Sequence, residues 1–170
     1  MRKRNEACRP AKVPGTHLAL ALMGLLAALA ALVFMTDPLL PVGLKAAILA
    51  LAAFAAAFIL LAPARLDYRV TPSRLEIRTF AGRRTLRKGQ IQNIRKVTYR
   101  LGSKGAGTNQ PGYYVGRFKI DLGTVRAFTS AARGDGVLLE LTSGEKLLIN
   151  PRDPERCLAP LGIELEEATP

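Results

Sequence analysis

Basic side chains crowd one segment of the chain, and they are the residue types with the clearest chemical meaning. Between residues 65 and 104 there are twelve Lys or Arg and only two acids, Asp67 and Glu76. Guanidinium and ammonium groups bind phosphate and carboxylate oxygens. Near an anionic membrane surface each gains about 1 kcal/mol. The candidate residues for binding an anion or a lipid headgroup are Arg83, Arg84, Arg87, Lys88 and Lys104.

This basic block has two other interpretations. It can serve only to fix the orientation of neighbouring membrane segments. Nucleic-acid binding is also compatible with a formal net charge of +12. Only 6% of the residues are aromatic, however, so few rings are present to stack on bases. We therefore expect no nucleic-acid partner.

The other reactive residue types form no catalytic or metal-binding pattern. The chain has one histidine, His17, and two cysteines far apart in sequence, Cys8 and Cys157. This set cannot make a Cys/His zinc site, and no nucleophile has a base at a recognisable spacing. We expect no enzymatic activity, no metal and no cofactor. In a reducing cytoplasm both cysteines are expected to be free thiols.

A glycine-rich stretch, LGSKGAGT at residues 101–108, invites comparison with a phosphate-binding loop. It lacks the G-x-x-x-x-G-K-[ST] pattern, and a Pro-Gly turn rather than a helix follows it, which argues against nucleotide binding. Its backbone amides and Lys104 could hold an anion in a mobile loop. The simpler interpretation is a flexible hairpin insertion.

Two apolar runs, 18–35 and 42–62, precede the basic block. Each is close to the roughly 20 helical residues that cross a bilayer. The first run is longer than the apolar part of a signal peptide, and a second follows at once, so we predict a transmembrane hairpin. The predicted organisation is a basic tail, a two-helix hairpin with spans at about 17–36 and 42–63, and a soluble domain: 1–16, 17–64 and 65–170.

The basic residues also predict how this hairpin is oriented. Nine Lys or Arg flank its outer ends, and none lies in the connecting segment 36–41. By the positive-inside rule both termini are expected in the cytoplasm, which makes this a multi-pass protein of the bacterial inner membrane. Small residues four apart, such as Ala27 and Ala31, could pack the hairpin on itself or on a second copy. An alanine-rich composition alone also explains that spacing.

After residue 64 the pattern changes to period-two alternation, which is typical of strands with one buried and one wet face. Turn residues separate the alternating segments at hairpin spacing. The alternating segments are 74–79, 118–122 and 137–142. A three-residue spacing of Ile91, Ile94 and Val97 suggests a helical turn that leads into a strand near 95–100.

The end of the domain has the signals of a short helix. Asp153 is a candidate N-cap, Pro154 suits the first helical position, and Gly162 can close the helix in the left-handed conformation. About seven strands and one C-terminal helix in roughly 100 residues predict a mainly β, α+β domain. We expect an antiparallel β-sandwich or partly open barrel capped by that helix.

These segments resemble the bacterial pleckstrin-homology (PH) domain family. PGYYVGRFKIDLGTVRAFTS and GVLLELTSGEKLLINPRDPERCLAPL are similar to its second half, with a strand pair, a hairpin, a P-x-D-P element and a capping helix. RKGQIQNIRKV resembles the entry to its third or fourth strand. The resemblance covers residues 66–163 and implies a seven-stranded PH-like fold, often preceded by two transmembrane helices; it implies no activity. One departure is Cys157-Leu158, where many such domains have an aromatic residue.

These observations lead to two hypotheses for function. The first is an integral membrane protein whose PH-like domain is an interaction module for another protein or for its own copies. The alternative is that the five basic candidates bind anionic phospholipid headgroups directly. A third hypothesis, a subunit that tunes a membrane enzyme, needs a stoichiometric partner. The sequence alone names neither ligand nor partner.

Overall fold

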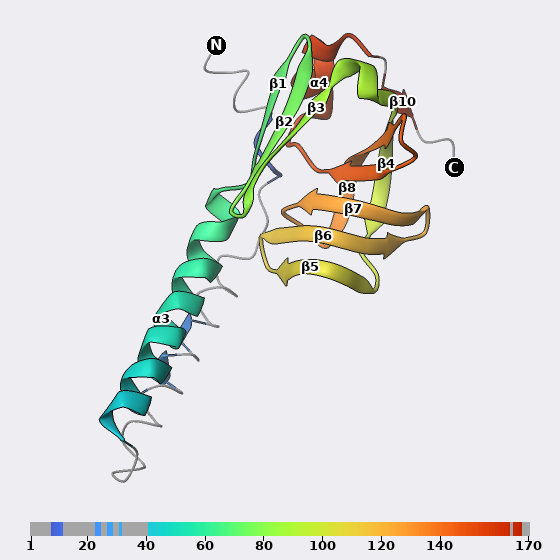
Figure 1. Cartoon of the computed structure of the whole chain (residues 1–170). Coiled ribbons are helices and arrows are strands. Elements are labelled where there is room, and N and C mark those ends of the chain that lie inside the picture. Colours follow the sequence, from blue (N-terminus) through green and yellow to red (C-terminus); the bar gives the residue numbers. More distant parts are fainter. Residues whose placement is uncertain are drawn as a thin grey trace.

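A computed structural model describes residues 8–11, 23–24, 27–28, 31, 41–163 and 165–167. It contains a long helix, α3, followed by a strand-rich domain that carries a short helix near its end (Figure 1). Only Arg65 and Leu66 separate the helix from the first strand. The strand-rich domain therefore begins where α3 ends.

α3 (Val42–Ala64) is the one helix in the described part of the chain that is long and apolar enough to cross a membrane. Its 23 residues rise about 34 Å, against about 30 Å for a hydrocarbon core. Large apolar side chains such as Leu51 and Phe54 point away from the rest of the protein. A surface of this kind suits contact with lipid.

The structure describes the second predicted span in full but only a few residues of the first. The second, at 42–63, coincides with α3. The first, at 17–36, falls mostly outside the described residues, as does the tail before Cys8. Within that first span the described residues are helical: 23–24, 27–28 and 31.

Ten strands and three short helical segments follow in the described residues. The strands are β1 (Asp67–Thr71), β2 (Arg74–Thr79), β3 (Gly82–Arg87), β4 (Ile91–Arg100), β5 (Lys104–Gln110), β6 (Tyr113–Ile120), β7 (Gly123–Thr129), β8 (Arg133–Leu141), β9 (Lys146–Ile149) and β10 (Glu166–Glu167). The helical segments are η1 (Lys88–Gln90), α4 (Pro154–Leu158) and η2 (Ala159–Leu161).

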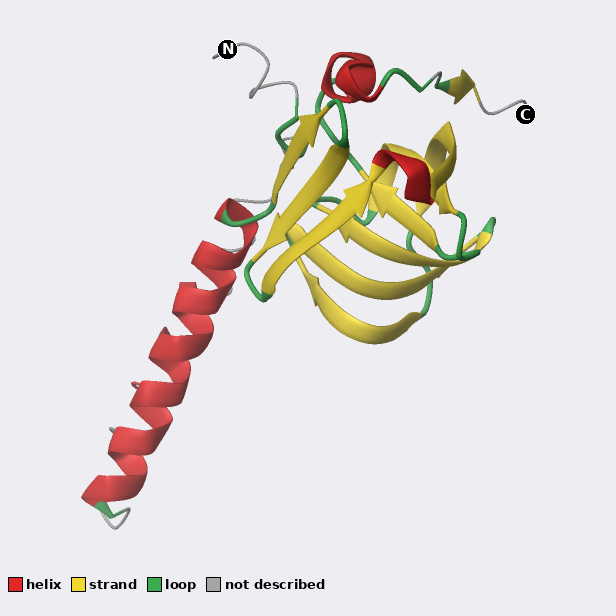
Figure 2. Cartoon of the chain, turned by 45° about the horizontal axis from the view of Figure 1, so that its top comes forward, coloured by secondary structure: helices red, strands yellow, loops and turns green. Residues whose placement is uncertain are grey.

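The strands form two sheets that pack as a sandwich (Figure 2). A three-stranded sheet has the order β1-β2-β3, and a seven-stranded sheet has the order β10-β4-β8-β9-β7-β6-β5. The predicted sandwich with a C-terminal helix is confirmed, whereas the predicted seven strands are too few. The prediction of a purely antiparallel arrangement is also wrong, because β7 pairs with β9, and β4 with β10, in parallel.

The central strands of the larger sheet, β8 and β9, are buried on both faces. On β8, Val137 and Leu139 belong to one apolar cluster, which also contains the inner residues of the three-stranded sheet. Leu138 points the other way, into a second cluster with Phe118 and Val125. The expectation of one wet face for the segment 137–142 is therefore wrong, because β8 is covered on both sides. Strands covered on both sides read as continuous apolar runs.

Most of the glycine-rich stretch, from Lys104 onward, lies in a strand, β5, and not in the predicted flexible loop. It pairs with β6 at the edge of the seven-stranded sheet. Gly107 faces Gly116, and a Cβ atom at Gly107 would lie 2.3 Å from the carbonyl oxygen of Val115. The two backbones approach so closely only because both residues lack a side chain.

The segment around Ile91 also differs from the prediction. The helical turn is η1, which ends at Gln90, and β4 already begins at Ile91. A bulge between Ile91 and Asn93 inserts an extra residue, which accounts for the three-residue spacing of Ile91 and Ile94 on one face. Val97 follows three residues later because it lies on the opposite face of β4, in the second apolar cluster.

The C-terminal helix has the predicted cap. The Asp153 side chain accepts a hydrogen bond from the Arg156 N–H at 3.1 Å, Pro154 opens α4, and Gly162 adopts a left-handed φ of 58° after η2. Cys157 and Leu158, at the position of the family's aromatic residue, are fully buried. The helix therefore docks on the core through small and branched side chains.

A short N-terminal strap, Cys8–Ala11, lies on the domain beside this helix. Cys8 and Cys157 form a disulfide with a Cα–Cα distance of 4.7 Å. Pro10 forms a β-bridge with Pro151, and the Ala11 N–H donates to the Asn150 carbonyl at 2.9 Å. The prediction of two free thiols is wrong, because the fold brings together cysteines 149 residues apart in sequence.

Candidate anion-binding surface

The outer face of the three-stranded sheet collects arginine side chains. Leu75 and Ile77 of β2 point into the core, so Arg74 and Arg78 point outward. Strand β3 follows the same alternation: Leu86 is buried, and Arg83 and Arg87 are exposed. We call the outward set the arginine face: Arg69, Arg74, Arg78, Arg83 and Arg87.

Like charges stand directly opposite each other on this face. Arg74 pairs in register with Arg87, and Arg78 with Arg83. Two carboxylates offset part of this charge: Glu76 accepts from Arg78 Nε at 2.7 Å, and Asp67 lies 3.4 Å from Arg69 Nε. The hydrogen bond from Arg78 holds the pKa of Glu76 below its ordinary value. Three positive charges remain without a matching acid on the face.

Opposed like charges destabilise a sheet, so replacing one should stabilise it. We expect Arg87→Glu, which places a carboxylate opposite Arg74, to stabilise the domain by up to about 1 kcal/mol. Added salt should shrink the gain, because the charges are exposed. Thermal unfolding at two salt concentrations tests this, with Lys119→Glu, an exposed change on the other sheet, as the control. An unchanged or lower midpoint for Arg87→Glu at low salt contradicts the prediction.

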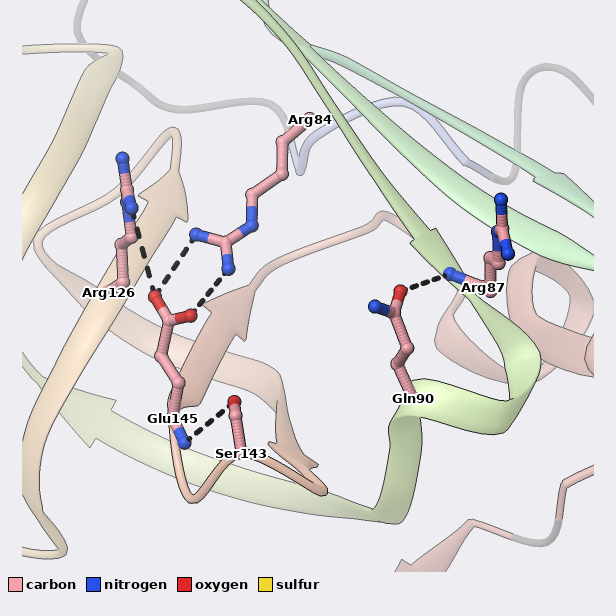
Figure 3. A network of polar contacts seen from close by, with 6 residues as sticks. All are labelled: Arg84, Arg87, Gln90, Arg126, Ser143 and Glu145. Carbon is pink, nitrogen blue, oxygen red and sulfur yellow. Dashed lines mark hydrogen bonds and ion pairs between the residues drawn. The ribbon is translucent and has the colours of Figure 1, made fainter.

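Arg84 points inward and is held by an acid on the other sheet (Figure 3). Its Nη1 and Nη2 donate to the two carboxylate oxygens of Glu145 at 3.0 and 2.5 Å. Arg126 lies 3.8 Å from the same carboxylate, and Glu145 is in the turn between β8 and β9. The hydrogen bonds from Arg84 hold the pKa of Glu145 below its ordinary value. This pair ties the two sheets together rather than leaving Arg84 free for a ligand.

The lowered pKa of Glu145 predicts a pH dependence of stability. A carboxylate with a depressed folded pKa stabilises the fold above its unfolded pKa, and the contribution is lost as pH falls through the folded value. We expect the wild-type thermal midpoint to fall more steeply than that of Glu145→Gln between pH 5 and 3, values chosen to bracket ordinary carboxyl pKa values near 4. Asp121→Asn, an exposed carboxyl change, is the control. Parallel pH profiles for wild type and Glu145→Gln would refute the prediction.

The other sequence candidates lie in different places. Arg87 is the last residue of β3, and its backbone N–H donates to Gln90 Oε1 at 2.9 Å. Lys88 is the first residue of η1, and its backbone N–H donates to the Ser73 carbonyl at 2.8 Å. Lys104 is exposed on β5, at the edge of the larger sheet. The structure therefore unites only Arg83 and Arg87 on one face, with Lys88 at its end. Arg69, Arg74 and Arg78 complete the face, and strand alternation alone could have identified them.

Nothing in the described residues suggests a metal centre, since no group of three His, Cys, Asp or Glu side chains is close enough to hold an ion. The groups that this surface offers to a ligand are the guanidinium groups of the arginine face.

The architecture of the strands and the capping helix agrees with a comparison to known families. A family described as Bacterial PH domain matches residues 66–162, more than half of the chain. The chain belongs to the bacterial PH domain family. The match begins two residues after α3 and ends at Gly162, so the PH domain includes both sheets except β10, together with the capping helix. Neither the curated proteins nor the solved structures contain a match.

Proposed function

We propose that this protein is a non-enzymatic, membrane-anchored interaction module, in which the PH domain presents its arginine face to another protein with an acidic surface. The observation that carries the proposal is the arginine face, where opposed like charges are retained at a cost in stability. A cost of this kind is typical of surfaces kept for function.

Two helices are proposed to hold the module in the membrane. The strap contacts the PH domain at Asn150 and Pro151, whereas Val42 starts α3 at the end farthest from the domain. The chain between Ala11 and Val42 therefore has to cover the length of α3, about 34 Å. A first transmembrane helix at 17–36 would cover it, and the strap and the PH domain would then share one side of the bilayer.

The side of the membrane can be tested through the disulfide. The flanking basic residues favour the cytoplasm, and we propose that side for both termini of a multi-pass inner-membrane protein. A disulfide is typical of oxidising compartments instead. Acid quenching of living cells, followed by alkylation, reports whether Cys8 and Cys157 are paired there. Two alkylated thiols support the cytoplasmic side and mean that the disulfide of the structure forms only under oxidising conditions; a pair trapped as a disulfide in the living cells overturns the cytoplasmic assignment.

The extent of the arginine face favours a protein over a lipid as the main partner. Strand β3 runs away from the end of α3 (Figures 1 and 2), and Arg87 lies four positions beyond Arg83, about 13 Å along the strand. A flat bilayer that reaches Arg83 therefore leaves Arg87 and Lys88 uncovered. A folded partner could cover the part of the arginine face that the bilayer leaves uncovered.

The chain's own acids argue against a second copy as that partner. Most carboxylates of the described residues are already engaged by basic side chains of the same chain. The engaged acids are Asp67, Glu76, Glu140, Glu145, Asp153 and Glu155. Because little acidic surface is left over, the complement to the arginine face is expected on a different protein.

Photo-cross-linking in native membranes tests this proposal. A benzophenone amino acid replaces Thr85, which is exposed between Arg83 and Arg87. In a control protein the same amino acid replaces Thr124, which is exposed on β7. We expect one acidic protein to cross-link at position 85 and not at 124. The adduct should be lost in Arg74→Glu/Arg87→Glu and kept in Lys119→Glu. Lipid adducts alone at position 85 would favour headgroup binding instead, and the absence of any adduct would overturn the proposal.

A further inference from the structure

The tip of the β2–β3 hairpin packs on the membrane helix. The Phe80 ring meets the Phe58 ring of α3 edge to face, with centroids 5.1 Å apart, and the Phe80 N–H donates to the Tyr113 hydroxyl at 3.1 Å. Tyr113 also faces Phe58, with centroids 6.4 Å apart. This aromatic group fixes the hairpin tip against the side of the helix.

A second contact lies beside it. A Cβ atom at Gly112, in the β5–β6 turn, would lie 3.2 Å from the Pro63 ring, so the turn rests on the last turn of α3. Ala62 and Leu66 are buried by the domain. The domain is therefore held in a fixed position at the end of α3, and does not hang from a flexible linker.

Phe80 nevertheless remains 45% exposed. A large ring that is already part of an aromatic contact is not expected to leave almost half of its surface in water. Arg78 and Arg83, which face each other across the hairpin, lie on either side of the tip. An exposed ring between two guanidinium groups has the composition of a membrane–water interface, where rings lie at headgroup level and cations meet phosphates.

The position of Phe58 along α3 gives the depth of the tip. A hydrocarbon core of about 30 Å that begins at Val42, the first residue of α3, ends at Ala62, about one turn beyond Phe58. Phe54 then lies near the middle of the core, and Phe58 lies about 6 Å from its edge. Phe80, which packs against Phe58, is therefore placed at the shallow edge of the core, next to the lipid interface.

We infer that the β2–β3 tip is a second membrane anchor: Phe80 inserts among the lipids at the interface, and Arg78 and Arg83 contact headgroup phosphates. This rests on the proposed function only in that α3 spans the bilayer; it does not need a protein partner. The second anchor fixes the rotation of the PH domain about α3. As a result, the end of the arginine face opposite the tip, which carries Arg74 and Arg87, is held facing away from the bilayer.

Tryptophan fluorescence tests the anchor directly, because the chain contains no tryptophan. Phe80→Trp keeps an aromatic ring on Phe58 and gives a single reporter. The full-length protein is reconstituted into phosphatidylglycerol/phosphatidylcholine vesicles brominated at shallow or deep acyl positions. We expect shallow bromines to quench Phe80→Trp strongly and deep bromines to quench it weakly.

Two further reporters make each outcome decisive. Ser73→Trp is exposed at the opposite end of the same sheet, and it should not be quenched. Phe54→Trp, 67% exposed on α3, should be quenched by deep bromines. Quenching of position 54 without position 80 overturns the anchor and leaves the membrane span standing. The absence of quenching at both positions overturns the span, and with it the proposed function.

Discussion

Asn150→Ala is expected to lower the thermal midpoint of the full-length protein in detergent by about 10 °C. Its side chain lies at the centre of a buried polar network, where Oδ1 accepts from the Ser130 N–H at 2.9 Å and Nδ2 donates to Ser130 Oγ at 3.0 Å. The Tyr68 hydroxyl lies 3.2 Å from the same Oδ1. Truncation leaves buried hydrogen-bond donors without partners, which costs about 2–3 kcal/mol of folding stability. In a domain of this size, a loss of 1 kcal/mol lowers the thermal midpoint by roughly 4–8 °C.

The network also explains why the effect should reach the strap. Ser130 Oγ donates to the Ala11 carbonyl at 2.8 Å, and the Tyr68 hydroxyl donates to the Phe128 carbonyl at 2.6 Å. Burial raises the pKa of Tyr68 well above its ordinary range, so the hydroxyl stays protonated and keeps donating. The side-chain amide of Asn150 therefore connects β1, β7, β9 and, through Ser130, the strap.

Asn109→Ala is the matched control, because Asn109 is exposed on β5. Its midpoint should stay within about 2 °C of wild type, as for most surface changes. A double mutant cycle of Asn150→Ala with Tyr68→Phe should show non-additive losses, since the two side chains share partners. Equal midpoints for Asn150→Ala and Asn109→Ala would show that the network contributes nothing to stability.

Local sequence patterns predicted the parts of the fold that local forces determine. The alternation of Arg74, Leu75, Glu76 and Ile77 shows which side chains of β2 enter the core, and the structure agrees. The cap at Asp153 and the closing Gly162 depend on neighbours within a few residues, so they too could be identified. Patterns of this range carry no information on which strands pair in parallel.

The predictions that were wrong have physical causes as well. β5 is rich in glycine, and residues without side chains cannot display a period of two, so a strand looked like a loop. Its pairing depends on Gly116, which lies on the next strand. The disulfide joins residues from the two ends of the chain, and only the complete fold brings them together.

The candidate site was half predictable. The basic block pointed to the sheet that carries the arginine face, but Arg83 and Arg84 were grouped although neighbours on a strand point to opposite faces. The structure accordingly places Arg83 outside and Arg84 on Glu145. Lys104 was chosen for a loop that is a strand of the other sheet. Applying the alternation to the arginines, as to the apolar residues, selects Arg74, Arg78, Arg83 and Arg87.

Reducing the Cys8–Cys157 disulfide is expected to destabilise the PH domain by about 2–4 kcal/mol, because the unfolded chain regains the freedom that the bond removed. The thermal midpoint in detergent should fall by roughly 10–20 °C. Both cysteines are buried in the core, with residue exposures of 5% and 0%, so slow reduction of the folded protein is expected as well. The measurement is thermal unfolding with and without reductant, with the thiol count verified by mass spectrometry.

Cys8→Ser/Cys157→Ser is the control that isolates the bond. It should unfold near the midpoint of the reduced wild type and should not respond to reductant. Hydrogen exchange gives the local readout: the amides of Ala11 and Arg152, which bridge strap and domain, should lose protection before the central strands do. An unchanged midpoint in fully reduced wild type would show that the strap's hydrogen bonds suffice without the disulfide.

The position of this bond makes its loss more than a change in domain stability. The strap precedes the predicted first span and the PH domain follows α3, so the disulfide closes a ring that contains the whole proposed hairpin. With the ring closed, both ends of the hairpin are fixed to one rigid domain. Opening it leaves Phe58, Pro63 and their partners as the contacts that orient the PH domain on α3. The quenching of Phe80→Trp by shallow bromines should therefore persist after reduction, whereas the exchange protection of Ala11 should not.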